Sequence, residues 1–185
     1  MTELGLGSDA PRDVVESKHI REGHVGLFAT HFIAEGDVAI TVRGTILSEP
    51  TRYSVQVGDG RHANSDGLIE NTNHSCTPSA FLDLSDAAAP RLRALRDIAL
   101  GGEITFNYCA SEEDMSSPFD CQCGAGRCYR EIKGFRYLTA EQRVDLGELA
   151  SPWLVAKYTE AQPTPDIGPS EATETRAEAR TARAS

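Results

Sequence analysis

Apolar residues along this chain fall into short runs that turn-forming residues separate. Runs with strand character lie at 14–17, 23–30, 38–42, 44–47, 53–57, 80–84, 91–95 and 104–108. Alternating apolar and polar side chains and frequent β-branched residues are typical of strands. Glu35-Gly36-Asp37 indicates a hairpin turn, and the polar segment 85–90 predicts that the runs beside it form an antiparallel pair. We therefore predict a mostly β fold.

Helical signals occur near the C-terminal end of the sequence. Thr139 followed by Gln142 is a capping-box pattern, which predicts a short helix that runs to Leu146. Ser151 and Pro152 predict a second short helix, with Ser151 as its cap and Pro152 at its first position. The mostly β fold is thus expected to end in short helices.

Length and periodicity indicate one domain with loose ends. The chain has 185 residues, which is enough for one domain with a core. Segments 1–13 and 161–185 lack apolar periodicity, so we expect a flexible N-terminus and a disordered tail. The sequence has no run of about 18 apolar residues and no secretory leader pattern. We expect a monomer with no membrane association, located in the cytoplasm, or in the nucleus if the source is eukaryotic.

The formal net charge of −10 bears on the partners of the chain. Nucleic acids are bound through clustered lysines and arginines, so no direct nucleic-acid binding is expected. A basic, lysine-containing protein or peptide is a better partner for an acidic chain. The alternative is that the charge serves solubility alone.

Three of the five cysteines, Cys121, Cys123 and Cys128, lie close together in the sequence. An odd number of cysteines with this spacing fits a metal site in a reducing compartment better than a disulfide framework. A structural zinc site needs four ligands, so a fourth must come from elsewhere. By spacing alone, Cys76, Cys109 or a histidine is available. The pattern predicts one structural zinc ion.

Three further motifs precede this cluster. They are Gly23-x-x-Gly26-Leu27-Phe28-Ala29, Asn73-His74-Ser75-Cys76, and Gly102 through Tyr108. A lone glycine pair is most often a turn, and a lone Asn-His pair most often satisfies the backbone of a loop. Taken together and in this order, over about residues 14–137, the motifs resemble the SET-domain protein-lysine methyltransferases that carry a post-SET zinc knuckle.

The resemblance implies a SET fold of several short sheets with a pseudoknot, in which the Asn73 segment threads beneath the segment that ends at Tyr108. It divides the chain into a SET domain at 14–118, a post-SET zinc knuckle at 119–138 and a C-terminal helical segment at 139–160. It also selects the fourth zinc ligand. The implied zinc ligands are Cys76, Cys121, Cys123 and Cys128.

The resemblance further implies that the chain binds S-adenosylmethionine. The implied cofactor-binding residues are Gly26, Leu27, Phe28, Tyr53, Asn73, His74 and Phe135, the last as a ring that stacks on adenine. For Tyr53, core packing is an alternative. The sequence departs from the Gly-x-Gly loop of the family, because Gly23 and Gly26 are three positions apart, and Glu70-Asn71-Thr72 replaces the usual residues before the Asn-His motif.

Tyr108 and Phe106 match the catalytic positions of the family. A lysine attacks a sulfonium methyl group only as a neutral amine, yet a free lysine has a pKa of about 10.4, so the site must depress that value. A tyrosine hydroxyl with a pKa of about 10 suits orientation of the amine better than proton removal. Phe106 lies on the same strand face and leaves room for a methylated amine, which favours di- or trimethylation. The ordinary alternative for Tyr108 is a core tyrosine with its hydroxyl at the surface.

These observations predict an S-adenosylmethionine-dependent methyltransferase acting on the side-chain amine of lysine in a protein substrate. Two alternatives remain open. The first is a non-catalytic, zinc-stabilised module that binds peptides, which the altered glycine loop and Glu70-Asn71-Thr72 favour. The second is a methyltransferase for a small amine, which a closed channel without a peptide-binding surface would favour.

Overall fold

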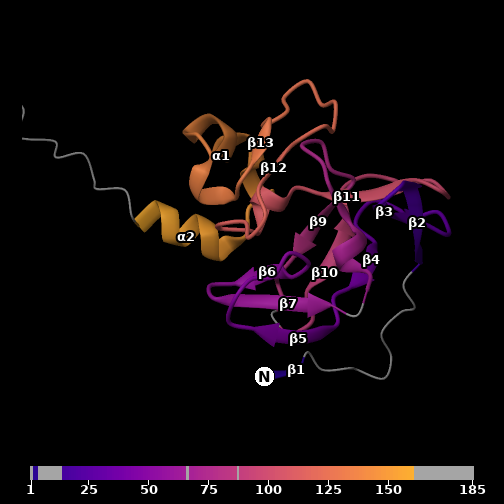
Figure 1. The fold of residues 1–185 in the computed structure, drawn as a ribbon, viewed down its shortest axis with the longest axis horizontal. Coiled ribbons are helices and arrows are strands. Elements are labelled where there is room, and N and C mark those ends of the chain that lie inside the picture. The colour runs from indigo at the N-terminus through magenta and orange to yellow at the C-terminus, as the bar shows by residue number, and fades with distance from the viewer. Residues whose placement is uncertain (1, 4–13, 66, 87, 161–185) are drawn as a thin grey trace, which may run out of the picture.

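The computed structural model describes residues 2–3, 14–65, 67–86 and 88–160 (Figure 1). The strands are β1 Thr2–Glu3, β2 Val15–Arg21, β3 His24–Ala29, β4 Val38–Thr41, β5 Gly44–Leu47, β6 Val55–Gly58, β7 Arg61–Ser65, β8 Asn73–His74, β9 Ala80–Asp83, β10 Arg91–Ala94, β11 Glu103–Phe106, β12 Phe119–Asp120 and β13 Glu131–Ile132. The helices are α1 Ala140–Leu146 and α2 Pro152–Glu160, with 3₁₀ turns at Ile69–Asn71, Tyr108–Ala110, Phe135–Tyr137 and Gly147–Leu149. The fold is mostly β with few short helices, as predicted.

Within the described ranges the strands form several small sheets. Their orders are β1-β5-β7-β6, β4-β10-β9, β2-β3-β11-β8 and β12-β13. The β8–β11 pair is parallel, with Asn73 opposite Thr105 and His74 opposite Phe106, whereas the other strand pairs of the described residues are antiparallel. This parallel pair joins the Asn-His motif to the segment that ends at Tyr108. Threading of one segment beneath the other stays a prediction.

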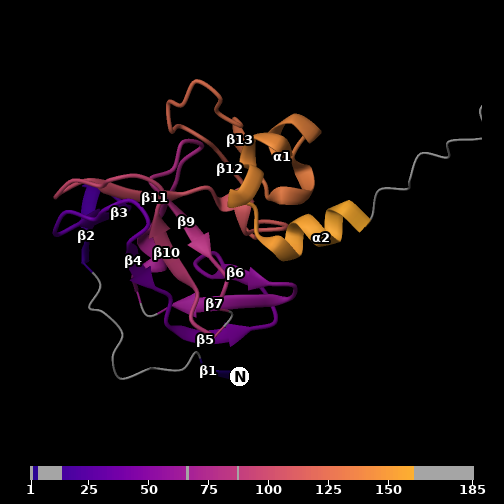
Figure 2. The same ribbon diagram turned by 180° about the vertical axis from the view of Figure 1, so that it is seen from behind.

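The buried side chains form two clusters. The first core fills the space among the sheets of β3, β4, β6, β7, β9, β10 and β11; its fully buried members include Leu27, Leu92 and Ile104. The second core lies under β13, α1 and α2, around Ile132 and Leu154. Figures 1 and 2 show the helices together with β12 and β13 at one side of the molecule, away from β2, β3 and β4. Tyr108 packs against both cores.

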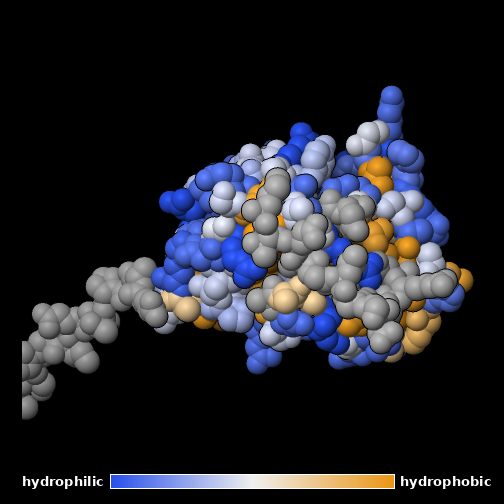
Figure 3. All heavy atoms as spheres, turned by 90° about the horizontal axis from the view of Figure 1, so that it is seen from below, coloured by the Kyte–Doolittle hydropathy of each residue, from blue (hydrophilic) through white to orange (hydrophobic). Residues whose placement is uncertain are grey.

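The face seen in Figure 3 is largely polar where described residues are visible. Where the described residues are visible in Figure 3, hydrophilic side chains alternate with small hydrophobic groups. This agrees with the acidic composition of the chain. No helix among the described residues is both long and apolar enough to cross a membrane.

Several predicted elements are confirmed. Strands β9 and β10 form the predicted antiparallel pair, with Leu82 opposite Leu92. The capping box is present: the Thr139 hydroxyl accepts from the Gln142 N–H, and the Gln142 side chain accepts from the Thr139 N–H. The helix it begins ends at Leu146, as predicted.

Three local predictions are wrong. The turn at Gly36 exists, but β4 pairs with β10 and Ile33 bridges to Ile98, so the flanking segments do not form a hairpin. Tyr108 does not end a strand but begins a 3₁₀ turn. The second helix begins at Pro152 as predicted, but the hydroxyl of Ser151 before it makes no capping hydrogen bond within the described structure; the Ser151 carbonyl accepts from the N–H groups of Leu154 and Val155. Strand choice depends on distant partners, which local turn chemistry does not specify.

The expectations for the two ends of the chain are only partly addressed. Thr2–Glu3 forms strand β1, which the sequence did not predict, and pairs with Thr45–Ile46 of β5. Residues 4–13 and the expected disordered tail, 161–185, lie outside the described residues.

Candidate active site and metal centre

Phe106 and Tyr108 reach the site from the end of β11. The Asn107 side chain accepts from the Cys109 N–H at 3.1 Å, which ends the strand and starts the 3₁₀ turn. The turn leaves the rings of Phe106 and Tyr108 as neighbours, with centroids 4.8 Å apart. The Tyr108 hydroxyl donates to the Thr72 carbonyl at 2.7 Å. The ring is therefore fixed at both its base and its tip.

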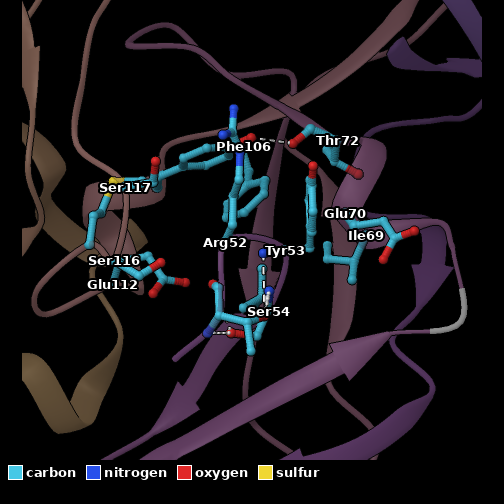
Figure 4. Close-up of a pocket in the computed structure, with 14 residues that line it drawn as sticks. Arg52, Tyr53, Ser54, Ile69, Glu70, Thr72, Phe106, Glu112, Ser116 and Ser117 are labelled. Atoms are coloured by element: carbon cyan, nitrogen blue, oxygen red, sulfur yellow. Dashed lines mark hydrogen bonds between the residues drawn. The ribbon is translucent and has the colours of Figure 1, made fainter. Parts of the chain in front are cut away.

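These two rings line a pocket with about 450 Å³ of empty space, part of it open to solvent (Figure 4). The remaining lining residues are Thr51, Arg52, Tyr53, Ser54, Val55, Ile69, Glu70, Thr72, Glu112, Met115, Ser116 and Ser117. In Figure 4, Phe106 and Arg52 face the space between the two walls, and the hydrogen bond to Thr72 closes its inner end. The pocket combines an apolar floor with a few polar groups, as small-ligand sites do.

Electrostatics hold the Tyr108 hydroxyl in its protonated form. Burial, followed by the nearby carboxylates of Glu112 and Glu103, raises the pKa of Tyr108 well above its ordinary value. The hydroxyl is thus a hydrogen-bond donor at neutral pH. Burial also raises the pKa of Glu112 to about 7, against the opposing effect of the N–H of Gln56.

His74 connects this pocket to the cysteine cluster. Its Nδ1 accepts from the Tyr108 N–H at 3.2 Å, and its Nε2 lies 3.3 Å from Cys76 Sγ. Since Nδ1 is an acceptor, the ring proton belongs on Nε2. Burial lowers the pKa of His74 to about 4, so the ring is neutral and bridges the two sites by hydrogen bonds.

A second arrangement of polar groups surrounds Gly26, on β3. The Asn73 side-chain amide donates to the Val25 carbonyl at 3.1 Å and to Glu103 Oε1 at 2.8 Å. A Cβ atom at Gly26 would lie 2.9 Å from Glu103 Oε1, 3.1 Å from Asn73 Nδ2 and 2.7 Å from Ile20 Cδ1. Only glycine fits beside these groups. The glycine therefore allows Ile20, Asn73 and Glu103 to pack directly against the backbone of β3, and its role in cofactor binding stays a prediction.

Four cysteines form a compact cluster. The Sγ atoms of Cys76, Cys121, Cys123 and Cys128 all lie within 4.8 Å of one another. Cys76 Sγ is 3.9 Å from Cys121 Sγ and 4.0 Å from Cys128 Sγ. Zinc–sulfur bonds of about 2.3 Å place sulfurs about 3.8 Å apart in a tetrahedron, so this donor set fits zinc.

The backbone around the cluster is arranged to support it. The Tyr129 N–H donates to Cys76 Sγ at 3.3 Å, and the Arg130 N–H donates to Cys128 Sγ at 3.4 Å. Arg130 adopts a left-handed conformation (φ 70°), and its carbonyl accepts from the Cys121 N–H at 2.6 Å. N–H groups aimed at sulfur favour the thiolate that a metal requires. Cys109 stands apart, fully buried in the second core.

The remaining predicted site residues lie in different surroundings. Tyr53 precedes β6, remains 59% exposed and lines the pocket. Leu27 is fully buried between β2 and β11, and Phe28 is half-buried, with Lys18 Nζ 5.5 Å from its ring. Phe135 lies in the second core and does not line the pocket. Its role as an adenine-stacking ring stays a prediction.

Sequence reasoning missed three groups at the site. Glu112 lines the pocket, Glu103 holds Asn73, and the Thr72 carbonyl receives the Tyr108 hydroxyl. Glu103 lies inside the motif from Gly102 to Tyr108, and Thr72 directly precedes the Asn-His motif. Their positions in the sequence could therefore have indicated that they belong to the site. Glu112 offered a weaker signal, as the first of three adjacent acidic residues, Glu112 to Asp114.

Comparison with known proteins gives related findings. Residues 24–109 match a family model described as SET domain. An alignment of 104 residues is 35% identical to methyltransferase flvH of Aspergillus flavus and covers 56% of this chain and 54% of that protein. An alignment of 128 residues is 38% identical to histone-lysine N-methyltransferase 2B of Homo sapiens and covers 57% of this chain and 5% of that protein. This chain thus spans about half of the fungal protein and a small part of the human one.

A third relative matches over a longer part of this chain. It is the histone-lysine N-methyltransferase, H3 lysine-36 specific, of Candida albicans, which is 30% identical over 146 residues; the match covers 72% of this chain and 16% of that protein. Among solved structures, KRYPTONITE in complex with mCHH DNA, H3(1-15) peptide and SAH matches with a TM-score of 0.50 at 18% identity. That match covers 63% of this chain and 29% of the other, and at this identity it concerns the fold alone.

Proposed function

We propose that this chain, whose residues 24–109 match the SET domain family model, transfers methyl groups from S-adenosylmethionine to the side-chain amine of lysine in a protein or peptide. The observation that carries this proposal is the setting of Tyr108. Its hydroxyl is anchored at the inner end of a pocket floored by Phe106, and its main chain is anchored on the Asn-His motif through His74. The segment that ends at Tyr108 therefore lines the pocket, and the Asn-His motif is joined to it through His74.

The cofactor supplies, when bound, a methyl group on a positively charged sulfur. The backbone at Gly26 with Asn73 and His74 would hold it, and the hydrogen bonds that tie the Asn73 side chain to the Val25 carbonyl and to Glu103, beside Gly26, support this assignment. The apolar wall around Phe106 and Ile69 removes water from the substrate amine, which lowers the pKa of the amine. The protonated Tyr108 hydroxyl orients the nitrogen and does not take its proton.

The four clustered cysteines hold one structural zinc ion in this proposal. Cys76 follows the Asn-His motif directly, whereas Cys121, Cys123 and Cys128 belong to the segment after the catalytic tyrosine. Zinc would therefore staple that segment beside the pocket. A closed four-sulfur site leaves no open position for substrate, so the ion acts structurally.

The substrate class follows from chemistry and from relatives. The human and Candida relatives are named as histone-lysine methyltransferases, and the KRYPTONITE crystal contains an H3(1-15) peptide and SAH. A lysine-rich peptide also suits a chain with a net charge of −10. Phe106, without a hydroxyl that would hold a water molecule beside the amine, favours di- or trimethylated products.

Calorimetric titration of the zinc-loaded protein with S-adenosylmethionine tests the proposal. Wild-type protein is expected to bind the cofactor with micromolar affinity, and Asn73→Ala to lose that binding because the amide that organises the Gly26 segment is gone. A folded wild-type protein that binds no cofactor would support the non-catalytic module instead. Cofactor binding with methylation of free small amines but of no peptide would support the small-amine methyltransferase.

A further inference from the structure

Glu112 is a buried carboxylate at the proposed substrate pocket, and no cation pairs with it among the described residues. Its side chain is only 7% exposed and lines the pocket together with Tyr108. In Figure 4 it lies on the wall opposite Ile69 and Thr72. Among the described residues Glu112 forms no ion pair. Burying a carboxylate without a paired cation costs free energy, so its presence requires a reason.

The backbone holds Glu112 firmly in place. Its N–H donates to the Tyr108 carbonyl at 2.8 Å, and its carbonyl accepts from the Phe135 N–H at 2.7 Å. Its Oε1 accepts from the Gln56 N–H at 2.7 Å, while the Gln56 side chain accepts from the Glu113 N–H at 2.8 Å. A glutamine at position 112 would accept from Gln56 equally well. The negative charge is therefore not needed for the fold, and the second carboxylate oxygen remains available to a ligand.

We propose that Glu112 receives the substrate amine in its ammonium form, binds the positively charged nitrogen and takes one proton from it. The inference rests on the proposed function and adds the proton acceptor that the protonated Tyr108 does not provide. The pocket is then selective for cationic amines over neutral groups of the same shape.

The proton balance of this step is simple. One N–H bond of the ammonium breaks and an O–H bond forms on Glu112, which leaves a neutral amine and a neutral carboxylic acid. The lone pair on nitrogen is then free to form a bond to the sulfonium methyl group, while the bond between that carbon and sulfur breaks and its electron pair stays on sulfur. The positive charge passes from sulfur to the methylated nitrogen. Glu112 returns its proton to water through the open mouth of the pocket. A pKa of about 7 suits a group that accepts and releases a proton at neutral pH.

Other ionisable groups surround Glu112, and each must be considered as a cause of any pH dependence in substrate binding. Four of them line the pocket: Tyr108, Tyr53, Arg52 and Glu70. Cys109 and Glu113 lie on the same segment as Glu112, and His62 lies opposite Gln56 on the adjacent strand. The pKa of Tyr108 lies well above neutral, and burial raises the pKa of Cys109 to about 11. Burial lowers the pKa of His62, so this ring is neutral near pH 7.

The test compares two probes that differ only in the terminal group. Nα-acetyl-lysine methylamide carries an ammonium, and its 6-hydroxynorleucine analogue carries a hydroxyl of similar size. Both are titrated by NMR into the zinc-loaded full chain with S-adenosylhomocysteine present, so that binding is read without turnover. The wild-type protein at pH 8 is expected to prefer the amine by about 10- to 100-fold, the range for a hydrogen bond to a charged group.

The preference must fall as pH decreases from 8 to 6. Glu112 is ionised above its pKa of about 7 and neutral below it, while the amine remains charged over this range. Glu112→Gln is expected to lose the preference and its pH dependence while it keeps its affinity for the hydroxyl probe. Glu113→Gln is the matched control, because Glu113 does not line the pocket and should leave the preference intact.

Retention of the amine preference in Glu112→Gln, or its absence in the wild-type protein, would overturn the inference. The wild-type pH series decides the matter even if the variant is unstable. Because neither probe needs to be methylated, failure of the proposed function is separate: it would appear as a clear amine preference without methyl transfer when S-adenosylmethionine replaces the product.

Discussion

At the scale of the residue, two side chains of the site are held by hydrogen bonds to backbone carbonyls. The Tyr108 hydroxyl donates a hydrogen bond to the Thr72 carbonyl, and the Asn73 side-chain amide donates one to the Val25 carbonyl. Backbone acceptors move little when side chains are substituted. Single substitutions should therefore report the loss of one group with limited rearrangement around it.

Tyr108→Phe should abolish most methyl transfer but spare cofactor binding. The change removes the hydroxyl that orients the amine, and loss of one oriented donor typically costs about 10²- to 10³-fold in kcat. The stability cost is about 1 kcal/mol, because the Thr72 carbonyl loses its partner. Single-turnover methylation of a lysine peptide, beside calorimetry with S-adenosylmethionine, measures both effects. An unchanged rate constant would remove Tyr108 from the catalytic step.

Phe106→Tyr should shift products toward monomethyl-lysine. The Phe106 ring lines the pocket 4.8 Å from Tyr108, so a hydroxyl added at its outer edge would hold water near the amine and restrict a methylated nitrogen. Mass spectrometry of a methylated peptide at equal turnover gives the product ratio. The same ratio in both proteins would show that this ring does not limit the degree of methylation.

The sequence indicated which motif residues belong to the candidate site, but it did not indicate which residues surround them in space. The sequence indicated Tyr108, Asn73 and His74, because short motifs place them in a fixed order. Glu112 lies only four residues beyond Tyr108, yet its importance comes from Gln56, on a strand far away in the sequence. Burial raises the pKa of this carboxylate and a distant strand holds it in place, and neither effect can be read from the local sequence pattern.

At the scale of the element, short strands take their partners from distant segments. The β8–β11 pair and the β4–β10 pair each join strands far apart in the chain. The turn at Gly36 was visible in the sequence, but the pairing of β4 with β10 was not. Which strand pairs with which depends on how their side chains pack in the core, and local turn residues do not determine it. The capping box of α1 was predictable since all of its groups lie within four residues.

Cys76→Ser should reduce bound zinc far more than Cys109→Ser. Cys76 belongs to the cluster of four sulfurs, whereas Cys109 lies in the second core outside it. Thermal stability discriminates less well, because a serine hydroxyl buried at position 109 would itself cost about 1–3 kcal/mol. Zinc content per chain, measured on purified protein, is therefore the decisive quantity. Equal zinc loss in the two variants would undo the assignment of Cys76 as a ligand.

At the scale of the whole molecule, the two cores differ in what holds them together. The first core is enclosed by sheets with extensive strand pairing, around Leu27 and Ile104. The second is smaller and lies under short helices and a two-stranded sheet, next to Cys76 and Cys121. A core of this size needs a further constraint, and a zinc ion held by the four clustered cysteines would provide one.

The buried hydrogen bonds of Gln56 with Glu112 and Glu113 also join the sheets to the second core, whereas the surface links are weak by comparison. Lys157 on α2 pairs with Asp59 at 3.0 Å and with Glu113 at 2.8 Å, and the Tyr158 hydroxyl donates to Glu113 at 2.9 Å. Lys157 is largely exposed, and such surface ion pairs contribute about 0–1 kcal/mol. Tyr108, which packs against both cores, is a further buried link. Order at the active site should therefore depend on zinc.

Removal of zinc by a chelator should open the second core and leave the first one closed. Hydrogen exchange at Ile132 and Leu154 is expected to accelerate by roughly two orders of magnitude or more, since structural zinc stabilises folding strongly. Exchange at Leu27 and Ile104 should change little, and Tyr108, between the cores, should respond in part. Added zinc restores protection if the effect belongs to the metal. Equal acceleration in both cores would mean that the molecule unfolds as one unit, and no acceleration would mean that packing alone holds the C-terminal segment over the pocket.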